Sequence, residues 1–169
     1  MHIETDRLII TEFRPAMAEA VHRNSLDEDT RRFVPDEVFE TVEEAAETIA
    51  FLMDCYASGD GPLVYPVLLK DGTNIGYVQA VPLEEGGWEI GYHIGGRYTG
   101  NGYATEAVRA FLPVIMQQLG ISCMQGVCVA ENHASVKVME RCGFVKTFDG
   151  AGSYQGETLH IRKFEYTLK

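Results

Sequence analysis

A glycine-bearing turn between a strand and a helix constrains this chain more than any other feature. A strand-like run, Trp88 to Ile94, precedes the segment Arg97 to Ala104, which reads RYTGNGYA, and a helical pattern starts at Tyr103. The first amides of a helix lack intrahelical partners and lie at the positive end of its dipole, so they bind anions, especially phosphates. Glycine lets the backbone turn sharply and approach a ligand closely. The segment therefore predicts a pyrophosphate-binding turn.

The spacing of the glycines separates three kinds of phosphate-binding loop. A P-loop ends in Gly-Lys-Ser/Thr, and no lysine follows Gly100 or Gly102. A dinucleotide-binding turn needs Gly or Ala three residues after its second glycine, where this chain has Thr105. The pattern that remains is Arg-x-x-Gly-x-Gly-x-Ala. The alternative is an ordinary strand-to-helix turn that binds nothing.

Length and composition indicate one soluble globular domain over residues 1–169. The chain has 46% hydrophobic and 23% charged residues, which is an ordinary globular balance. No apolar run approaches the ~20 residues that cross a bilayer. The N-terminus has neither a basic start nor an apolar core, so we expect no secretory signal and a cytoplasmic location. We expect no membrane partner.

Charge and metal-ligating residues exclude several classes of function. The four cysteines show no Cys-x-x-Cys spacing and the five histidines are scattered singly, so we expect no metal and no redox site. The formal net charge of −11 argues against nucleic acid, which is bound through Lys and Arg. An acidic surface attracts cationic partners such as amines, but it also serves solubility alone.

Periodicity and turn signals predict alternating strands and helices. A capping box begins a helix at Thr41, Asp71-Gly72 marks a hairpin turn, and Gly143 ends a helix after Cys142. We expect an irregular segment from Arg31 to Glu40 and a mobile loop from Asp149 to Glu157. The predicted strands are 7–13, 63–69, 75–81, 88–94, 121–129, 144–148 and 159–167, and the predicted helices are 15–26, 41–58, 103–119 and 132–142.

The strands on either side of the helix from Tyr103 should run parallel, because a crossover joins them. The other strands are linked by hairpins. The expected fold is therefore α/β (α+β): a mixed, mostly antiparallel sheet of six to seven strands with helices on both faces.

Four motifs in register resemble the GNAT N-acetyltransferases, and among them the ribosomal-protein (RimJ/RimL-like) branch. They are the opening strand Thr5 to Ile10, the Glu-Ile-Gly-Tyr strand from Trp88, the turn Gly100 to Ala107, and Asn132 to Ser135 with Gly143-Phe144. The match spans essentially the whole chain. It implies an acetyl-CoA-dependent enzyme that acetylates an amine, and the turn would hold the diphosphate.

The resemblance also implies which residues bind acetyl-CoA. In the family the strand before the turn separates from its neighbour and leaves unpaired backbone donors for the pantetheine and the thioester oxygen. Asn132 can bind a pantetheine amide, although Asn is also a plain helix N-cap. The expected cofactor-binding residues are Tyr92, His93, Ile94, Arg97, Tyr98, Thr99, Gly100, Asn101, Gly102, Tyr103, Ala104, Asn132 and Ser135.

Attack by an amine requires a proton acceptor, because a free alkylamine has a pKa near ~10. Alternation puts Glu89, Gly91 and His93 on one face of their strand. If this face lines the acceptor site, Glu89 is the best base, directly or through water. It could equally pair with a cation or face solvent. His93 ranks second, since a lone strand histidine is more often structural.

Departure of the thiolate requires a proton donor. Many family members carry a Tyr for this purpose, but the matching position here is Met139. Ser135 or water remains as the donor, although Ser135 could merely belong to the first turn of its helix. Cys128 or Cys142 as a covalent acyl carrier is a weaker hypothesis, because buried structural thiols are far commoner.

The expected partner is a peptide or small-molecule amine, bound by Phe33 to Glu40 and by the loop from Asp149. The resemblance suggests a protein N-terminal amine, and the same branch contains enzymes for small amines. The chain could be a monomer or a homodimer. Two competing functions are a non-catalytic CoA-binding regulatory module and a structural partner-binding domain.

Overall fold

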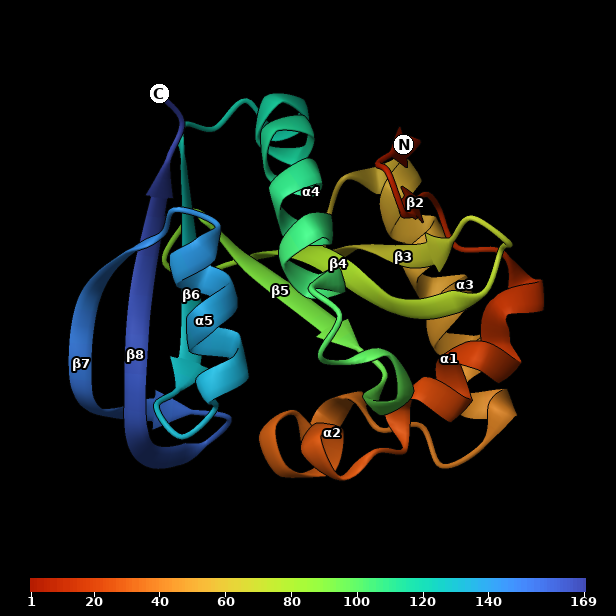
Figure 1. The fold of residues 1–169 in the computed structure, drawn as a ribbon, viewed down its shortest axis with the longest axis horizontal. Helices are drawn as coiled ribbons and strands as arrows, with labels where there is room; N and C mark the ends of the chain where they lie inside the picture. Colours follow the sequence, from red (N-terminus) through yellow and green to blue (C-terminus); the bar gives the residue numbers. More distant parts are fainter.

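The computed structural model describes residues 1–169 and contains a single eight-stranded sheet with five α-helices (Figure 1). The strands are β1 (Ile3–Glu4), β2 (Leu8–Ile10), β3 (Leu63–Leu69), β4 (Asn74–Pro82), β5 (Trp88–Ile94), β6 (Cys123–Val129), β7 (Val145–Tyr154) and β8 (Glu157–Thr167). The α-helices are α1 (Ala18–Ser25), α2 (Glu28–Phe33), α3 (Val42–Ser58), α4 (Tyr103–Leu119) and α5 (His133–Arg141). Three short 3-10 helices are η1 (Pro15–Met17), η2 (Pro35–Glu37) and η3 (Gly96–Tyr98).

The sheet is mixed and mostly antiparallel, as the sequence predicts. Its strand order is β1-β2-β3-β4-β5-β6-β8-β7, and only β5 and β6 pair in parallel. The last strand, β8, lies between β6 and β7. One strand more than expected is present, because Ile3 and Glu4 pair with Ile10 and Ile9 of β2.

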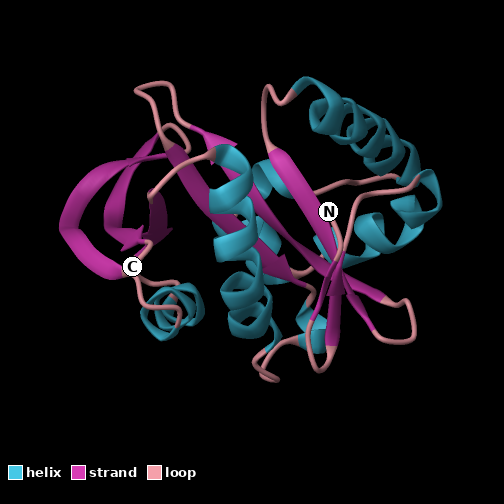
Figure 2. Cartoon of the chain, turned by 90° about the horizontal axis from the view of Figure 1, so that it is seen from above, coloured by secondary structure: helices cyan, strands magenta, loops and turns pink.

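Helices cover both faces of the sheet (Figure 2). Strand β3 is buried on both sides: Tyr65 and Val67 belong to the core under α4, whereas Val64 and Leu68 pack with residues of α1 and α3. This explains why β3 is an unbroken apolar run rather than an alternating one. Residues of α5 join the core on the α4 side. No helix is both long and apolar enough to span a membrane.

The segment from Asp149 to Glu157 is not a loop, and this expectation was wrong. Strands β7 and β8 continue through it and meet at a turn of Gln155 and Gly156, with φ of 50° and 79°. Two such residues suit a tight hairpin turn. The strand glycines allow close packing instead of mobility: a Cβ at Gly152 would lie 2.5 Å from Cδ1 of Ile161.

The segment from Arg31 to Glu40 is also more regular than expected. Its first residues belong to α2, which Asp27 caps by accepting a hydrogen bond from the Thr30 amide at 2.7 Å. Pro35 then starts η2. Half of the expected capping box is present at the next helix: the Thr41 hydroxyl accepts from the Glu44 amide, but the Glu44 carboxylate accepts from the amide of Glu40 and not from that of Thr41.

Candidate active site

Strands β5 and β6 separate almost as soon as they meet. Their ladder contains one register pair, Glu89 with Gln125, and the two strands then diverge (Figure 1). Gly95 donates to the Ile75 carbonyl of β4. Because hydrogen bonds alternate along an antiparallel strand, the amides of Ile94 and Tyr92 point away from β4, into the gap. These are unpaired donors of the kind that an oxyanion or a pantetheine amide needs.

The turn between β5 and α4 presents a run of free amides. No amide from Thr99 to Thr105 donates a hydrogen bond within the protein, whereas the Tyr98 amide is used by the Gly95 carbonyl. Gly102 is the N-cap of α4, with a φ of 78° and no capping side chain. We call residues 98–105 the cradle. Its donors and the exposed, unpaired Arg97 fit a diphosphate.

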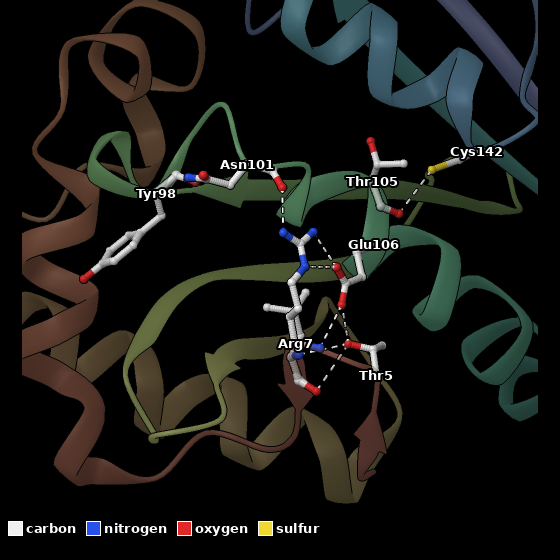
Figure 3. Close-up of polar contacts among 8 residues, drawn as sticks. Thr5, Arg7, Tyr98, Asn101, Thr105, Glu106 and Cys142 are labelled. Atoms are coloured by element: carbon white, nitrogen blue, oxygen red, sulfur yellow. Dashed lines mark hydrogen bonds and ion pairs between the residues drawn. The ribbon is translucent and has the colours of Figure 1, made fainter.

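A network of ion pairs and hydrogen bonds connects the cradle to the N-terminal segment of the chain (Figure 3). Arg7 forms an ion pair with Glu106 at 2.6 Å and donates to the Asn101 carbonyl at 2.9 Å. The Thr5 hydroxyl donates to the same carboxylate at 2.7 Å. Burial raises the pKa of Glu106, but the bonds from Thr5 and Arg7 outweigh it, so the pKa is lowered. The Thr-x-Arg-Leu motif therefore fixes the cradle's backbone.

A cleft of about 630 Å³ opens where β5 and β6 separate. We call it the cleft. Residues from both faces of β5 line it, since the gap between the strands joins the two sides of the sheet. Its walls include η2, the β4–β5 turn, α5 and the tip of the β7–β8 hairpin: Glu37, Gln79, Glu84, Glu85, Glu89, Tyr92, Asn132, Ser135, Met139, Tyr154 and Lys163.

Glu89 lines the cleft and forms no ion pair or hydrogen bond within the protein. Burial raises the pKa of its carboxyl, and the charge of Lys163 opposes this only partly. Glu37 lies on the η2 wall, where burial likewise raises its pKa. Tyr154 lies near both carboxyls. Its pKa is raised to about 12, first by burial and then by the charges of Glu89 and Glu37. A raised carboxyl pKa suits a general base.

Tyr92 and Ser135 face each other across the gap. The Tyr92 hydroxyl lies 2.8 Å from Oγ of Ser135 and 3.0 Å from the Ser135 carbonyl oxygen. Burial raises the pKa of Tyr92 far above its ordinary value, so the phenol keeps its proton. Asn132 caps α5 through Oδ1, which accepts from the Ser135 amide at 3.2 Å and leaves its Nδ2 unbound. Met139 is buried beside this pair and offers no proton.

His93 does not reach the gap. Its amide faces β4, and its ring lies against α2, where Nε2 is 2.6 Å from the Thr30 hydroxyl and 3.4 Å from an Asp27 oxygen. The structure thus brings Glu89, Tyr92, Asn132 and Ser135 together around one cleft and leaves the His93 side chain behind its wall.

The cysteines are poorly suited to carry an acyl group. Burial raises the pKa of Cys128 and of Cys142 to about 11, so the nucleophilic thiolate is scarce. Cys142 instead donates to the Thr105 carbonyl at 3.7 Å (Figure 3). No group of three or more His, Cys, Asp or Glu side chains is arranged to hold a metal ion.

Comparison with known proteins shows which family the chain belongs to. The family model described as the acetyltransferase (GNAT) domain matches residues 7–145. This chain belongs to the GNAT acetyltransferases. The N-acetyltransferase YnaD of Bacillus subtilis (strain 168), described as uncharacterized, is 32% identical to this GNAT chain over 145 residues, which cover 85% of it and 82% of YnaD.

Solved GNAT structures agree. An acetyltransferase of the GNAT family from Bacillus anthracis is 26% identical, with a TM-score of 0.82 over 99% of this chain and 98% of that one. RimL, a ribosomal L7/L12 alpha-N-protein acetyltransferase in complex with coenzyme A, has a TM-score of 0.84 at 16% identity over 99% and 98% of the two chains. The second likeness shows a common fold. The family match and the N-acetyltransferase relatives support an acetyltransferase.

Several residues of the cleft were not singled out from the sequence. Glu37 belongs to a segment that was expected to be irregular. Tyr154 belongs to the expected loop, and Lys163 follows it. Alternation along β8 was the one available signal for Lys163, since it places Lys163 and Ile161 on one face. No local pattern pointed to Tyr154.

Proposed function

We propose that this protein transfers the acetyl group of acetyl-CoA to a primary amine by direct attack in a ternary complex. One observation carries the proposal: the gap after the Glu89–Gln125 pair joins the free amides of β5 to a cleft with an unpaired carboxylate. An amine and a thioester can therefore meet at one point from opposite faces of the sheet. Two solved structures of similar fold support this cofactor, because RimL is in complex with coenzyme A and a microcin C7 self-immunity acetyltransferase is in complex with acetyl-CoA.

The cradle residues Tyr98 to Ala104 would hold the diphosphate, together with Arg97. The Asn132 amide would bind the pantetheine, and the amides of Tyr92 and Ile94 lie where the pantetheine and the thioester oxygen would accept hydrogen bonds. Backbone amides fixed by a strand stabilise a developing oxyanion without reorganising. In this proposal His93 contributes no donor to the cofactor.

The chemistry needs one new N–C bond, loss of the C–S bond, and two proton transfers. Glu89 would take a proton from the attacking nitrogen, directly or through water. Ser135 would donate a proton to the departing thiolate and regain one, through solvent, from the proton that Glu89 has taken, so that both residues end unchanged. The Tyr92 hydroxyl would hold Ser135 in place. Initial-velocity lines that intersect would support the ternary complex, and parallel lines would point to a covalent enzyme intermediate.

The acceptor would be a protein N-terminal amine or a small-molecule amine. The structural neighbours described as ribosomal-protein acetyltransferases favour a protein N-terminal amine. A microcin C7 self-immunity acetyltransferase has a similar fold, so the fold is not confined to ribosomal-protein acetyltransferases. The test is release of free CoA thiol with a serine-initiated peptide, spermidine, lysine or kanamycin as acceptor. Thiol release that depends on one amine supports the proposal.

Binding is measured separately from turnover. Calorimetry should show that CoA binds, and CoA should raise the melting temperature. A protein that binds CoA but acetylates none of the four amine classes would contradict the proposed reaction. A protein that does not bind CoA would contradict the assignment of the cradle as well.

A further inference from the structure

A second, smaller cavity lies behind the η2 wall of the cleft. Its volume is about 20 Å³, which is enough for one buried water molecule. Glu37 and Tyr77 line both the cleft and this small cavity, so one wall separates the two spaces. Its other lining residues include Thr30, Asn74 and His93.

Asn74 points to a water in the small cavity. Its side chain is buried, with the residue 7% exposed, and its Nδ2 has no hydrogen-bond partner. The Oδ1 atom is already used, because it accepts from the Gly76 amide at 3.1 Å. An unpaired buried donor costs about 1–3 kcal/mol. A water that accepts from Asn74 removes this cost, and it then has two protons to share with neighbours.

His93 lines the same cavity, and its Nε2 lies 3.4 Å from a carboxylate oxygen of Asp27. The side chains of His93 and Asp27 are 14% and 23% exposed, so this pair reaches solvent. Burial would raise the pKa of Asp27, but hydrogen bonds from His93 and Thr30 lower it well below its ordinary value. Asp27 therefore stays ionised and gives a counter-ion to a proton on the ring. Besides Asp27, the ring faces Glu37 of η2, the Thr30 hydroxyl and the stacked Tyr77, 5.9 Å away.

The proposed reaction requires two protons to leave the acceptor nitrogen. An ammonium has three N–H bonds and the amide product has one. The CoA thiolate takes one proton, so one net proton must reach solvent in each turnover. Four carboxylates without ion pairs line the cleft. Glu84 and Glu85 are exposed, whereas Glu89 on β5 and Glu37 on η2 are partly buried. Glu37 accepts only a weak hydrogen bond from Gln79 at 3.4 Å.

We propose that Glu37, one water in the small cavity and the His93–Asp27 pair form a relay that carries the net proton from the acceptor ammonium to solvent. This inference rests on the proposed acetyl transfer. The ammonium N–H bond breaks and an O–H bond forms on Glu37, and the proton then passes through the water to the His93 ring and out. The neutral amine attacks, and Glu89 takes the second proton.

Two variants test the relay with the panel acceptor that the wild-type protein acetylates fastest, over pH 6 to pH 10. Glu37→Gln and His93→Gln should each lower kcat/KM about tenfold or more near pH 6.5. The loss should shrink to less than about twofold near pH 10, where about half of an alkylamine is already neutral before it binds. The double variant should be no slower than the slower single variant, because both act on one path.

Asp36→Asn is the matched control. It removes one negative charge from η2, yet Asp36 lines neither cavity. It should stay within about twofold of wild type at every pH, as expected for an exposed charge. Melting temperature and acetyl-CoA affinity are measured for each variant. If His93→Gln does not fold, Glu37→Gln alone decides.

The outcomes separate the relay from the reaction itself. A loss that is equal at every pH, or one that multiplies in the double variant, would assign Glu37 and His93 a structural role and overturn the relay alone. If the wild-type protein binds CoA but acetylates no amine of the panel, the proposed reaction fails, and the relay fails with it.

Discussion

The cradle and the η2 wall of the cleft are both expected to contact substrate, but they are built differently. The cradle is made of backbone: its amides from Thr99 to Thr105 are free, and side chains mainly brace it from outside. The wall is made of side chains from distant segments, with Glu37 on η2 and Tyr154 on the β7–β8 hairpin. A backbone site such as the cradle suits a cofactor that related enzymes share. A side-chain site such as the η2 wall suits an acceptor that differs between them.

The difference also decides how each region tolerates change. A backbone site depends on conformation, so it is sensitive to a substitution that strains φ and insensitive to most side-chain exchanges. A side-chain site depends on charge and reach, so single polar substitutions alter it without disturbing the fold. Each prediction below separates the two regions by measuring cofactor binding and turnover independently.

Gly102→Val should have the largest effect. A β-branched residue is strained at the Gly102 φ of 78°, and its Cβ would lie 3.6 Å from Nη2 of Arg7, which braces the cradle. We expect acetyl-CoA affinity to fall more than about 100-fold by calorimetry, because several amides lose their alignment together. Gly120→Val is the control: Gly120 ends the same helix with a φ of 65° and nothing within 4 Å of a new Cβ. It should lower stability and leave affinity intact.

Glu89→Gln should affect turnover and not binding. We expect kcat to fall about 100-fold, a typical general-base effect, with acetyl-CoA affinity within about twofold. Glu157→Gln, an exposed substitution of the same kind, should have no effect on either. An unchanged kcat would remove Glu89 as the base.

The same substitution should raise stability at neutral pH. The folded-state pKa of Glu89 is raised, so its protonated form is favoured in the folded protein, and this stabilising contribution is lost as pH rises through that pKa. At pH 7 the wild-type protein therefore carries an unfavourable buried charge that Gln lacks. The melting temperature of Glu89→Gln should exceed that of wild type at pH 7, and the difference should shrink toward pH 4.

Ser135→Ala should slow turnover about tenfold through loss of the proton donor. Tyr92→Phe keeps the ring and removes the hydroxyl that holds Ser135, so its effect should be smaller and confined to kcat. Thiol-release rates with both variants, and equal acetyl-CoA affinities, check the assignment. If Tyr92→Phe were the slower of the two, the roles would be reversed.

Glu106→Gln should have the smallest effect. It weakens the ion pair with Arg7 and the bond from Thr5, which are partly exposed, so we expect a loss of about 1 kcal/mol in unfolding free energy. The cradle should loosen slightly, with acetyl-CoA affinity a few-fold weaker. Thermal melts and calorimetry measure both. An effect as large as that of Gly102→Val would mean that side chains, not glycines, shape the cradle.

Most of the fold could be predicted because its signals are local. Apolar periodicity and turn residues located β3, β5 and α4 to the residue, and the crossover between β5 and β6 required them to be parallel. The clearest error lies where glycine had a tertiary role. Gly150 and Gly152 read as a flexible loop, although they make room for Phe148 and Ile161 inside a hairpin. Only the packed structure distinguishes these uses.

The cradle could be located from sequence, since all its donors lie in one continuous segment. The cleft could not, because Glu37, Glu89 and Tyr154 are far apart in the chain and meet only through the sheet order. The side-chain position of His93 depends on α2. The sequence signal for this short helix is one capping residue, Asp27, which is too little to predict it. The contact between Tyr92 and Ser135 likewise requires β5 to separate from β6. No local sequence pattern predicts this separation.

The position of β8 has a consequence for how the molecule is made. Strand β8 lies between β6 and β7 and carries Lys163, while the hairpin tip before it carries Tyr154. The cradle, by contrast, lies before the end of α4, and its braces Thr5 and Arg7 lie near the N-terminus. During synthesis the segment proposed to hold the diphosphate therefore leaves the ribosome early, whereas the cleft stays incomplete until the final strand has been made.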